Sequence, residues 1–238
     1  MTGINCILDY AKYHGSVTAK DITSEYGMKL TTARQHLSRL SSNGNLVRIG
    51  YGVYALRDSG EDFPMQTTPE ADTIYNELHA LLPLADFCTY PGCVYEPLQH
   101  HISINHATYV ETNRDTVESV FSILKDKYDN VYLQPDMDFT RKYIDLRKDC
   151  IIIKPLVTEA PVSTVNGIPV PTLEKLLVDI LKDPDLEYLR GMEYQYMLET
   201  ALKQYRMSIS KLLRYARRRG VYDKIKSQID TISNSYND

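Results

Sequence analysis

The spacing of apolar residues changes between a helical and a strand-like pattern several times along this 238-residue chain. In residues 30–40 the apolar positions recur at intervals of three and four, which predicts a helix with one buried face. These positions are Leu30, Ala33, Leu37 and Leu40. A shorter helix is expected before it, because Thr18 and Asp21 can form a capping box and Gly27 can end the helix. Thr31 is expected to cap the second helix.

Two short apolar runs after the second helix predict a β-hairpin. The runs occupy residues 46–49 and 53–56, with turns expected at Asn43-Gly44 and at residues 50–52. Apolar residues from Ile4 to Ala11 predict a further helix near the start of the chain. Helices followed by a small hairpin form the pattern of a winged helix-turn-helix, which we predict for residues 1–57.

The polar face of the second helix carries side-chain types that contact base edges and phosphates when a helix lies in a DNA major groove. The candidate contacts are Thr31, Thr32, Arg34, Gln35, Ser38 and Arg39 on the helix and Arg48 and Tyr51 near the hairpin tip. Residues 1–57 hold seven Lys and Arg against three Asp and Glu, a net charge of +4, whereas the whole chain carries −4. This asymmetry favours contact with double-stranded DNA. Winged helices also bind proteins, so a scaffold that never meets DNA stays open as an alternative.

A polar segment rich in Gly and Pro, residues 58–68, predicts a linker after this first domain. Beyond it, apolar runs alternate with amphipathic helices, which predicts an α/β body at residues 69–182. The pattern then becomes helical throughout, so we expect a C-terminal helical subdomain at residues 183–238. The predicted fold class is therefore mixed α/β (α+β), with a winged helix at the N-terminus.

Strands and helices of the body are predicted from local signals. Strands are expected at residues 85–90, 107–112, 130–133 and 150–157. The last is expected to be central in its sheet, because it is a continuous run rich in β-branched residues. Thr68, Asp115 and Thr172 are expected to cap helices.

A second basic cluster lies near the end of the chain. It comprises Lys203, Arg206, Lys211, Arg214, Arg217, Arg218 and Arg219. Asp223 is expected to be their one nearby counterion, and tyrosines interleave with the cations, a composition that fits contact with a phosphate backbone. The alternative is a solvated helix whose cations complement the negative end of the helix dipole.

Residue types that bind metals occur in the body, but their spacing does not favour a site. They are Cys88, Cys93, His100, His101 and His106. Structural zinc sites pair cysteines two to four residues apart on a knuckle and histidines three to five apart. Cys88 also lies in an apolar run, where a free cysteine packs as a small hydrophobic residue. We therefore expect no metal and no other cofactor.

Two carboxylate patterns leave an enzyme open as the alternative function. Asp136 and Asp138 would share one side of a strand, as in metal-dependent nucleotidyltransferases, but no Gly-Ser turn precedes them. Asp136 with Asp145 and Arg147 faintly resembles a PD-(D/E)xK nuclease motif. Arg147 replaces the lysine there, and arginine does not readily release a proton. No glycine-rich phosphate loop or His-Glu-x-x-His motif is present, so we expect no catalysis.

No membrane association is expected. No stretch approaches the ~18 consecutive apolar residues of a membrane helix, and the N-terminus has no basic segment followed by an apolar run. A cytoplasmic location is therefore expected.

Three sequence segments together indicate a family. They are G-N-L-V-R-I-G-Y-G-V-Y-A-L at residues 44–56, I-P-V-P-T-L-E-K-L-L-V-D-I-L at 168–181 and S-K-L-L-R-Y-A-R-R-R-G at 210–220. In this order, spanning nearly the whole chain, they resemble the AbiEi family of antitoxins, the transcriptional regulators of type IV toxin-antitoxin systems.

The resemblance implies a bacterial protein that represses its own operon by binding inverted repeats beside the promoter. It implies that the first domain contacts DNA through residues 31–39 and the hairpin at residues 48–51. It also implies that a non-catalytic body counteracts a nucleotidyltransferase-like toxin, without requiring a direct complex. Positive patches on the body are linked to that second role in the family, and only residues 203–219 match this idea here.

Overall fold

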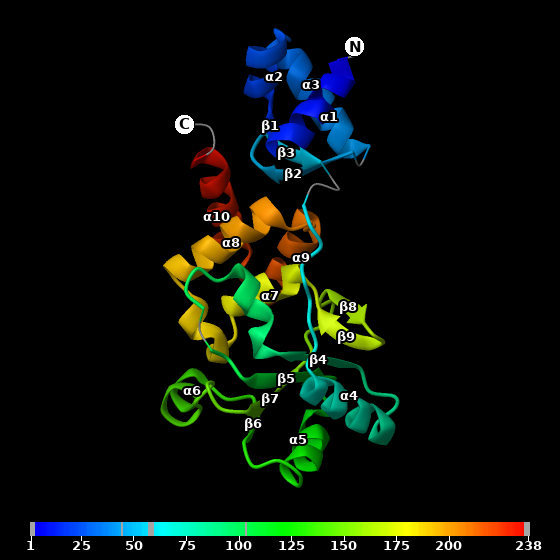
Figure 1. The fold of residues 1–238 in the computed structure, drawn as a ribbon, viewed down its shortest axis with the longest axis vertical. Helices are drawn as coiled ribbons and strands as arrows, with labels where there is room; N and C mark the ends of the chain where they lie inside the picture. Colours follow the sequence, from blue (N-terminus) through cyan, green and yellow to red (C-terminus); the bar gives the residue numbers. More distant parts are fainter. Residues whose placement is uncertain (1–2, 44, 57–59, 103, 236–238) are drawn as a thin grey trace.

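The computed structural model of the chain describes residues 3–43, 45–56, 60–102 and 104–235. Two parts follow one another along the long axis of the molecule, a head (residues 3–56) and a larger body (residues 60–235) (Figure 1). Both parts combine helices with small sheets, so the predicted mixed α/β class is confirmed. None of the helices in the described ranges is both long and apolar enough to cross a membrane.

The head contains three helices packed on a small antiparallel sheet. Its elements are α1 (Gly3–His14), β1 (Val17–Thr18), α2 (Ala19–Tyr26), α3 (Leu30–Ser42), β2 (Leu46–Gly50) and β3 (Val53–Leu56). The strand order is β1-β3-β2, so the predicted hairpin is present and β1 adds a third strand. The core joins five of these elements through Ile7, Val17, Ile22, Leu37 and Leu46, and Tyr54 and Leu56 of β3 pack against it.

The predicted ends of α2 are confirmed. The backbone N–H of Asp21 donates to the Thr18 hydroxyl at 3.2 Å, and Asp21 accepts from the N–H of Thr18 at 2.6 Å. Gly27 ends the helix with φ 65°, a left-handed conformation that suits glycine.

The predicted start of α3 is wrong. The helical hydrogen bonds already begin with the N–H of Ala33 donating to the carbonyl of Lys29 at 2.9 Å. Lys29 is therefore the residue before the helix, and Thr31 lies inside the first turn. Ala33 is buried with the rest of the predicted stripe, but Leu30 is 36% exposed because it is the first residue of the helix.

Some predicted positions lie outside the described residues, namely Gly44 of the expected turn, residue 57 at the end of the predicted first domain and residues 58–59 of the expected linker. The rest of that linker contacts the body. The N–H of Glu61 donates to Gln204 O at 2.9 Å, and the N–H of Arg206 donates to Glu61 O at 2.8 Å. Phe63 packs edge-on against Tyr205, with ring centroids 5.1 Å apart. This segment therefore lies against the body (Figure 1).

A four-stranded sheet forms the centre of the body. Its strands, in spatial order, are β4 (Phe87–Pro91), β5 (Ala107–Thr112), β7 (Cys150–Pro155) and β6 (Val131–Leu133). Strands β5, β7 and β6 are parallel, and β4 is antiparallel to β5. All four predicted strands are confirmed, and β7 lies inside the sheet as expected. The carboxyl ends of β5, β6 and β7 therefore meet at one edge.

Both faces of this sheet are covered, which explains the continuous apolar runs in its strands. One face packs against α4 (Pro69–Leu81) and α5 (Val117–Lys125) through residues such as Leu78, Val120 and Ile153. The other face packs against α7 (Leu173–Ile180) through residues such as Tyr90 and Leu176.

The predicted caps of the body helices are partly correct. Thr68 and Thr172 precede α4 and α7 as predicted, but only the Thr68 hydroxyl caps its helix, accepting from the N–H of Ala71 at 3.3 Å, whereas Thr172 makes no side-chain cap bond. Asp115 does not cap α5. A turn in which the N–H of Thr116 donates to Asn113 O at 3.0 Å makes Thr116 the residue before that helix.

The C-terminal region is helical, as predicted from residue 183 onward. It contains the short helix η2 (Pro184–Leu189), α8 (Met192–Gln204), α9 (Ile209–Arg219) and α10 (Tyr222–Ser235). A further short helix, η1 (Gly92–Leu98), and a hairpin of β8 (Val162–Val165) and β9 (Ile168–Pro171) complete the body with α6 (Met137–Tyr143). Helices α9 and α10 also contact β2, and so join the body to the head (Figure 1).

Candidate functional site

An open groove on the head lies between the hairpin and the first turns of α2 and α3. Its volume is about 680 Å³. Three cations, Lys20, Arg34 and Arg48, line it together with Tyr51. The pairing of Thr18 with Val53 in the sheet brings the start of α2 beside the hairpin. The structure therefore gathers predicted residues from two elements and adds Lys20, which the sequence analysis did not single out.

The predicted residues of α3 lie on the side away from the head core. Thr31, Arg34, Gln35, Ser38 and Arg39 are exposed, and Thr32 is half-buried. Arg34 reaches the groove, whereas Ser38 and Arg39 lie further along the helix and do not line it.

The hairpin tip presents a cation and an aromatic ring side by side. The guanidinium carbon of Arg48 lies 5.3 Å from the ring centre of Tyr51, and Arg48 Nε donates to the carbonyl of Gly50 at 2.9 Å. Tyr51 is 79% exposed, so one face of its ring and its hydroxyl are open to a ligand.

A second groove, of about 570 Å³, lies between the hairpin and the body. Arg48 lines it from the head, and Arg206 and Lys211 line it from the body. The start of α9 is fixed here, because the N–H of Ser208 donates to Glu174 Oε1 at 2.8 Å and the Ser208 hydroxyl accepts from Lys211 N at 3.3 Å. Two members of the predicted C-terminal basic cluster thus lie beside the hairpin.

The expectation that Asp223 is the main acid near that basic cluster is wrong. Lys203 pairs with Glu199 at 2.6 Å, and Arg206 pairs with Asp62 at 3.0 Å. Arg219 turns inward and pairs with Asp179 and Asp183. Glu199 lies one turn before Lys203 in α8, whereas Asp62, Asp179 and Asp183 come from segments that the sequence places elsewhere. The exposed cations of α9 are Lys211, Arg214, Arg217 and Arg218, and Arg218 donates to the Thr158 hydroxyl at 2.8 Å.

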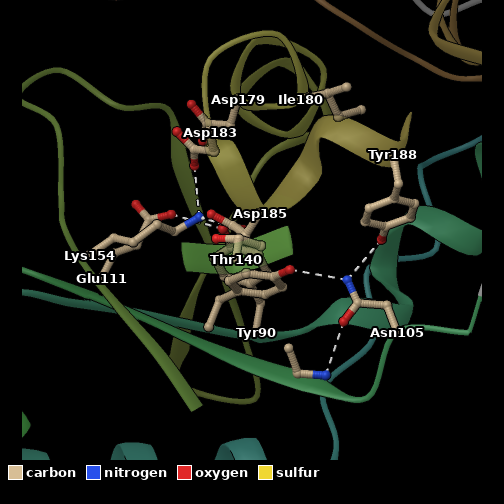
Figure 2. A network of polar contacts seen from close by, with 12 residues as sticks. Tyr90, Asn105, Glu111, Thr140, Lys154, Asp179, Ile180, Asp183, Asp185 and Tyr188 are labelled. Carbon is tan, nitrogen blue, oxygen red and sulfur yellow. Dashed lines mark hydrogen bonds and ion pairs between the residues drawn. The ribbon is translucent and has the colours of Figure 1, made fainter. Parts of the chain in front are cut away.

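A cluster of buried charges fills the carboxyl edge of the body sheet, between β5, β7 and the helices above them (Figure 2). Its members are Glu111, Lys154, Lys175, Asp179, Asp183, Asp185 and Arg219. None of the candidate site residues predicted from sequence belongs to it except Arg219, which was assigned to a surface patch.

The two lysines of the cluster each contact two carboxylates. Lys175 Nζ lies 2.6 Å from Glu111 Oε1 and 2.6 Å from Asp179 Oδ2. Lys154 Nζ lies 2.7 Å from Asp183 Oδ2 and 3.4 Å from Asp185 Oδ2 (Figure 2). Buried charges are tolerated when they are paired and hydrogen-bonded in this way.

Tyrosines surround the same charges. The Tyr90 hydroxyl donates to Glu111 Oε1 at 2.8 Å, and the Tyr215 hydroxyl donates to Asp179 Oδ1 at 3.0 Å. Lys154 Nζ also lies 4.6 Å from the ring centre of Tyr109, a cation–π arrangement.

The carboxylates of the cluster differ in acidity. Burial raises the pKa of Asp179 to about 6. Burial also raises the pKa of Asp185, to which the charge of Asp183 adds. The pKa of Asp183 is lowered: burial opposes this, but the positive charges of Lys154 and Arg219 outweigh it.

The carboxylates predicted for an enzyme do not come together in one site, although Asp136 lines a pocket beside the buried cluster. Asp136 does not lie on a strand; its side chain accepts from the N–H of Phe139 at 2.8 Å and caps α6. Asp138 is in the first turn of that helix. Asp145 pairs with Arg147 across an exposed turn at 2.8 Å, so neither residue faces the cluster. The strand prediction at 136–138 is therefore wrong, because the carboxylate serves as a helix cap.

The residue types considered for zinc are also dispersed. Cys88 is buried in β4, and burial raises the pKa of its thiol well above the ordinary value. His100 and His101 pack against each other edge-on, with ring centroids 4.3 Å apart. In the described ranges, no three His, Cys, Asp or Glu side chains are arranged to hold a metal ion.

A sequence signal for the buried cluster does exist. Lys154 follows three isoleucines, and Lys175 and Asp179 interrupt an otherwise apolar helix at a spacing of four. Charges inside strongly apolar segments must be paired when those segments are buried. This signal marks the residues but does not identify their partners, which come from other elements.

Comparison with protein families gives a match over most of the chain. The family model described as a family of unknown function, DUF6577, matches residues 32–235, from the first turn of α3 to the end of α10. No curated protein matches the chain significantly. Because the matched range covers well over half of the chain, the protein belongs to the DUF6577 family.

Proposed function

We propose that this DUF6577 protein is a DNA-binding transcriptional repressor of its own operon and that its head acts as a winged helix-turn-helix. The observation that carries the proposal is the groove on the head, where Arg34 of α3 meets Arg48 and Tyr51 of the hairpin. A recognition helix and a wing contribute contacts to DNA from these two positions.

The side chains on α3 suit reading of base edges. Arg34 and Gln35 lie near the start of the helix, where recognition helices contact the major groove. Arginine pairs with guanine through two hydrogen bonds, and glutamine pairs in the same way with adenine. Ser38 continues this exposed face one turn later.

The charges of the head are available for phosphates. Among the described residues, no salt bridge involves Lys20, Arg34 or Arg48. Each can therefore neutralise a phosphate and release condensed counterions, which is the main sequence-independent source of affinity for DNA. Arg206 and Lys211 extend the positive surface from the hairpin toward the body.

The proposal includes a second role, as the antitoxin of a type IV toxin-antitoxin system. It rests on the sequence resemblance to AbiEi antitoxins and on the exposed basic face of α9, with Lys211, Arg214 and Arg217. Co-expression tests it: the chain should relieve growth inhibition by a nucleotidyltransferase-like toxin from the same operon. Unrelieved inhibition would contradict the antitoxin role and leave DNA binding untouched.

DNA binding is tested by fluorescence anisotropy with the DNA immediately upstream of the gene, across a salt series and with scrambled competitor. We expect a Kd on the order of 10 nM or tighter, weakening steeply with salt. Arg34→Ala should weaken binding roughly 5- to 150-fold, the loss of one bidentate base contact. Arg114→Ala, which removes an exposed arginine of the body, is the matched control and should bind normally.

Equal affinity for upstream and scrambled DNA would contradict autorepression. Weak binding that Arg34→Ala leaves unchanged would favour instead a protein-interaction role for the head.

A further inference from the structure

A pocket of about 300 Å³ opens beside the buried charge cluster. Its walls include Glu111 of β5, Gln134 just after β6 and Lys154 of β7, with Asp185 and Arg219 on the helical side. The pocket therefore lies at the carboxyl ends of the three parallel strands. Ligands of open α/β sheets bind at this edge, and the volume is at the lower end of the range for small-molecule sites.

One buried oxygen in the pocket wall has no partner. Asp185 is 1% exposed, and its Oδ1 atom has no hydrogen bond to any described group, although Oδ2 lies 3.4 Å from Lys154 Nζ. Buried polar atoms are normally paired, and an unpaired one destabilises a protein by about 1–3 kcal/mol. An ionised carboxylate oxygen only accepts hydrogen bonds, so its missing partner is a donor.

The backbone at the mouth of the pocket is also unusual. Gln134 has φ 43°, a left-handed conformation that non-glycine residues rarely adopt, and its N–H donates to Ile153 O at 2.9 Å. Such conformations concentrate at ligand sites, where the surrounding structure holds them in place.

The charge balance identifies the class of ligand. The buried cluster holds four carboxylates, Glu111, Asp179, Asp183 and Asp185, against three cations, Lys154, Lys175 and Arg219. With every group ionised the balance of the cluster is −1, and Asp136 in the same pocket wall brings it to −2, so a ligand with two positive charges would neutralise it. A metal ion fits poorly, because the side chains of the described residues are not arranged to ligate one.

We propose that this pocket is the effector site of the repressor and takes a small organic cation whose ammonium or guanidinium group donates to Asp185 Oδ1. The effector role rests on the proposed DNA-binding function, whereas binding of the cation does not. Glu111 adds negative potential beside the same position.

Helix α9 connects the pocket with the head. Tyr215 and Arg219, near its C-terminus, line the pocket. Ser208 and Lys211, at its N-terminus, line the groove that Arg48 of the hairpin shares. A ligand that shifts Arg219 therefore acts on an element whose other end contacts β2.

The ligand also competes with protons. Burial raises the pKa of Asp185, and a protonated carboxyl no longer supplies the negative charge that attracts a cation. Lys154 and Asp183 are the charges that act most on Asp185, and the other charged groups lining the pocket are Glu111, Asp136, Asp179 and Arg219. Affinity for a cation should therefore fall as the pH is lowered toward the raised pKa.

The test measures binding of putrescine and agmatine to the full chain by calorimetry and by thermal unfolding, with 1-butanol as a neutral probe. We expect saturating putrescine or agmatine to raise Tm by about 5–10 °C, and the alcohol to leave it unchanged. Asp185→Asn should abolish the shift. Asp145→Asn, in an exposed turn, is the matched control and should retain it.

A second variant covers the case in which Asp185→Asn does not fold. Val157→Phe narrows the pocket and leaves every charge in place, so it should also remove the shift. If neither amine shifts Tm or releases heat, or if both variants bind normally, the site is overturned.

The effector role has its own readout. A saturating amine should change the Kd for upstream DNA at least several-fold, and Asp185→Asn or Val157→Phe should remove that change. An amine that binds without altering DNA affinity would overturn the effector role alone. An upstream DNA that binds no better than scrambled DNA would contradict the proposed repressor, whatever the calorimetry shows.

Discussion

Lys175 Nζ lies 2.6 Å from Glu111 Oε1, although the two residues are 64 positions apart and their side chains are only 1% and 3% exposed. The contact joins α7 to β5, and Lys175 also holds Asp179 within its own helix. One lysine thus connects the sheet to the helix that covers it, inside the apolar core.

Replacing Lys175 with Met should destabilise the protein by about 3–5 kcal/mol, because Glu111 and Asp179 would keep their buried charges without the shared partner. Urea unfolding followed by circular dichroism measures this directly. Lys127→Met is the control, since Lys127 pairs with Glu77 at 2.8 Å with exposed fractions of 47% and 35%. That change should alter stability by less than about 1 kcal/mol. Equal losses in the two variants would contradict the buried pairing.

Gly92 should not tolerate a side chain. A Cβ atom there would lie 2.2 Å from Asn105 Oδ1. Asn105 cannot easily move away, because it accepts from the N–H of Ala107 at 3.0 Å and donates to the hydroxyls of Tyr109 and Tyr188 at 3.0 and 2.8 Å (Figure 2). Gly92→Ala should therefore destabilise the protein by about 1–3 kcal/mol.

A double-mutant cycle isolates that clash. In an Asn105→Ala background the same Gly92→Ala change should have a much smaller effect, because the obstructing atoms are gone. Additive losses would mean that Gly92 matters for another reason.

Much of the fold follows from local patterns. The apolar runs at β5 and β7 and the capping box at Thr18 predict their elements because each signal acts within a few residues. The start of α3 is missed for a related reason. Thr31 is a good cap by residue type, but the hydrogen bond from Ala33 to Lys29 begins the helix earlier.

The two candidate sites differ in how far the sequence predicts them. Arg34, Arg48 and Tyr51 can be predicted because the exposed faces of a helix and a hairpin follow from periodicity. The buried cluster cannot, since Arg219 belongs to a run of three arginines, and only the packing of α9 on α7 turns it toward Asp179 and Asp183. The prediction that Asp136 lies on a strand is wrong, because the residue caps α6. Residue type alone does not separate the two roles, since an aspartate suits both.

Asp179 should make stability depend on pH. Its pKa is raised by burial from the ordinary value of 3.8 to about 6, so the folded state binds the proton more tightly than the unfolded state. Asp179 therefore stabilises the folded state at low pH. Up to about 3 kcal/mol of this stabilisation is lost as the pH rises from about 4 to 6. The groups facing it are Lys175, Arg219 and Tyr215, with Asp183 and Glu111 nearby.

The measurement compares urea unfolding of the wild type and Asp179→Asn across this pH range. The wild type should lose stability relative to the variant as the pH rises. Asp145→Asn should follow the wild type across this range, because Arg147 lowers the pKa of Asp145 below its ordinary value of 3.8 and that contribution is lost only as the pH falls further. If the wild type instead became more stable relative to Asp179→Asn as the pH rises, that result would contradict the raised pKa of Asp179.

The two kinds of DNA contact proposed for the head should separate in a salt series. Lys20→Gln removes a groove cation that would meet a phosphate, so it should weaken binding to upstream and scrambled DNA alike and lower the salt slope by about 1. Gln35→Ala should weaken binding to upstream DNA alone and leave the slope unchanged, because a base contact releases no counterion. Fluorescence anisotropy with both DNAs at several salt concentrations measures both effects. If the two variants lose affinity in the same proportion on both DNAs, α3 does not read sequence and the head binds DNA by charge alone.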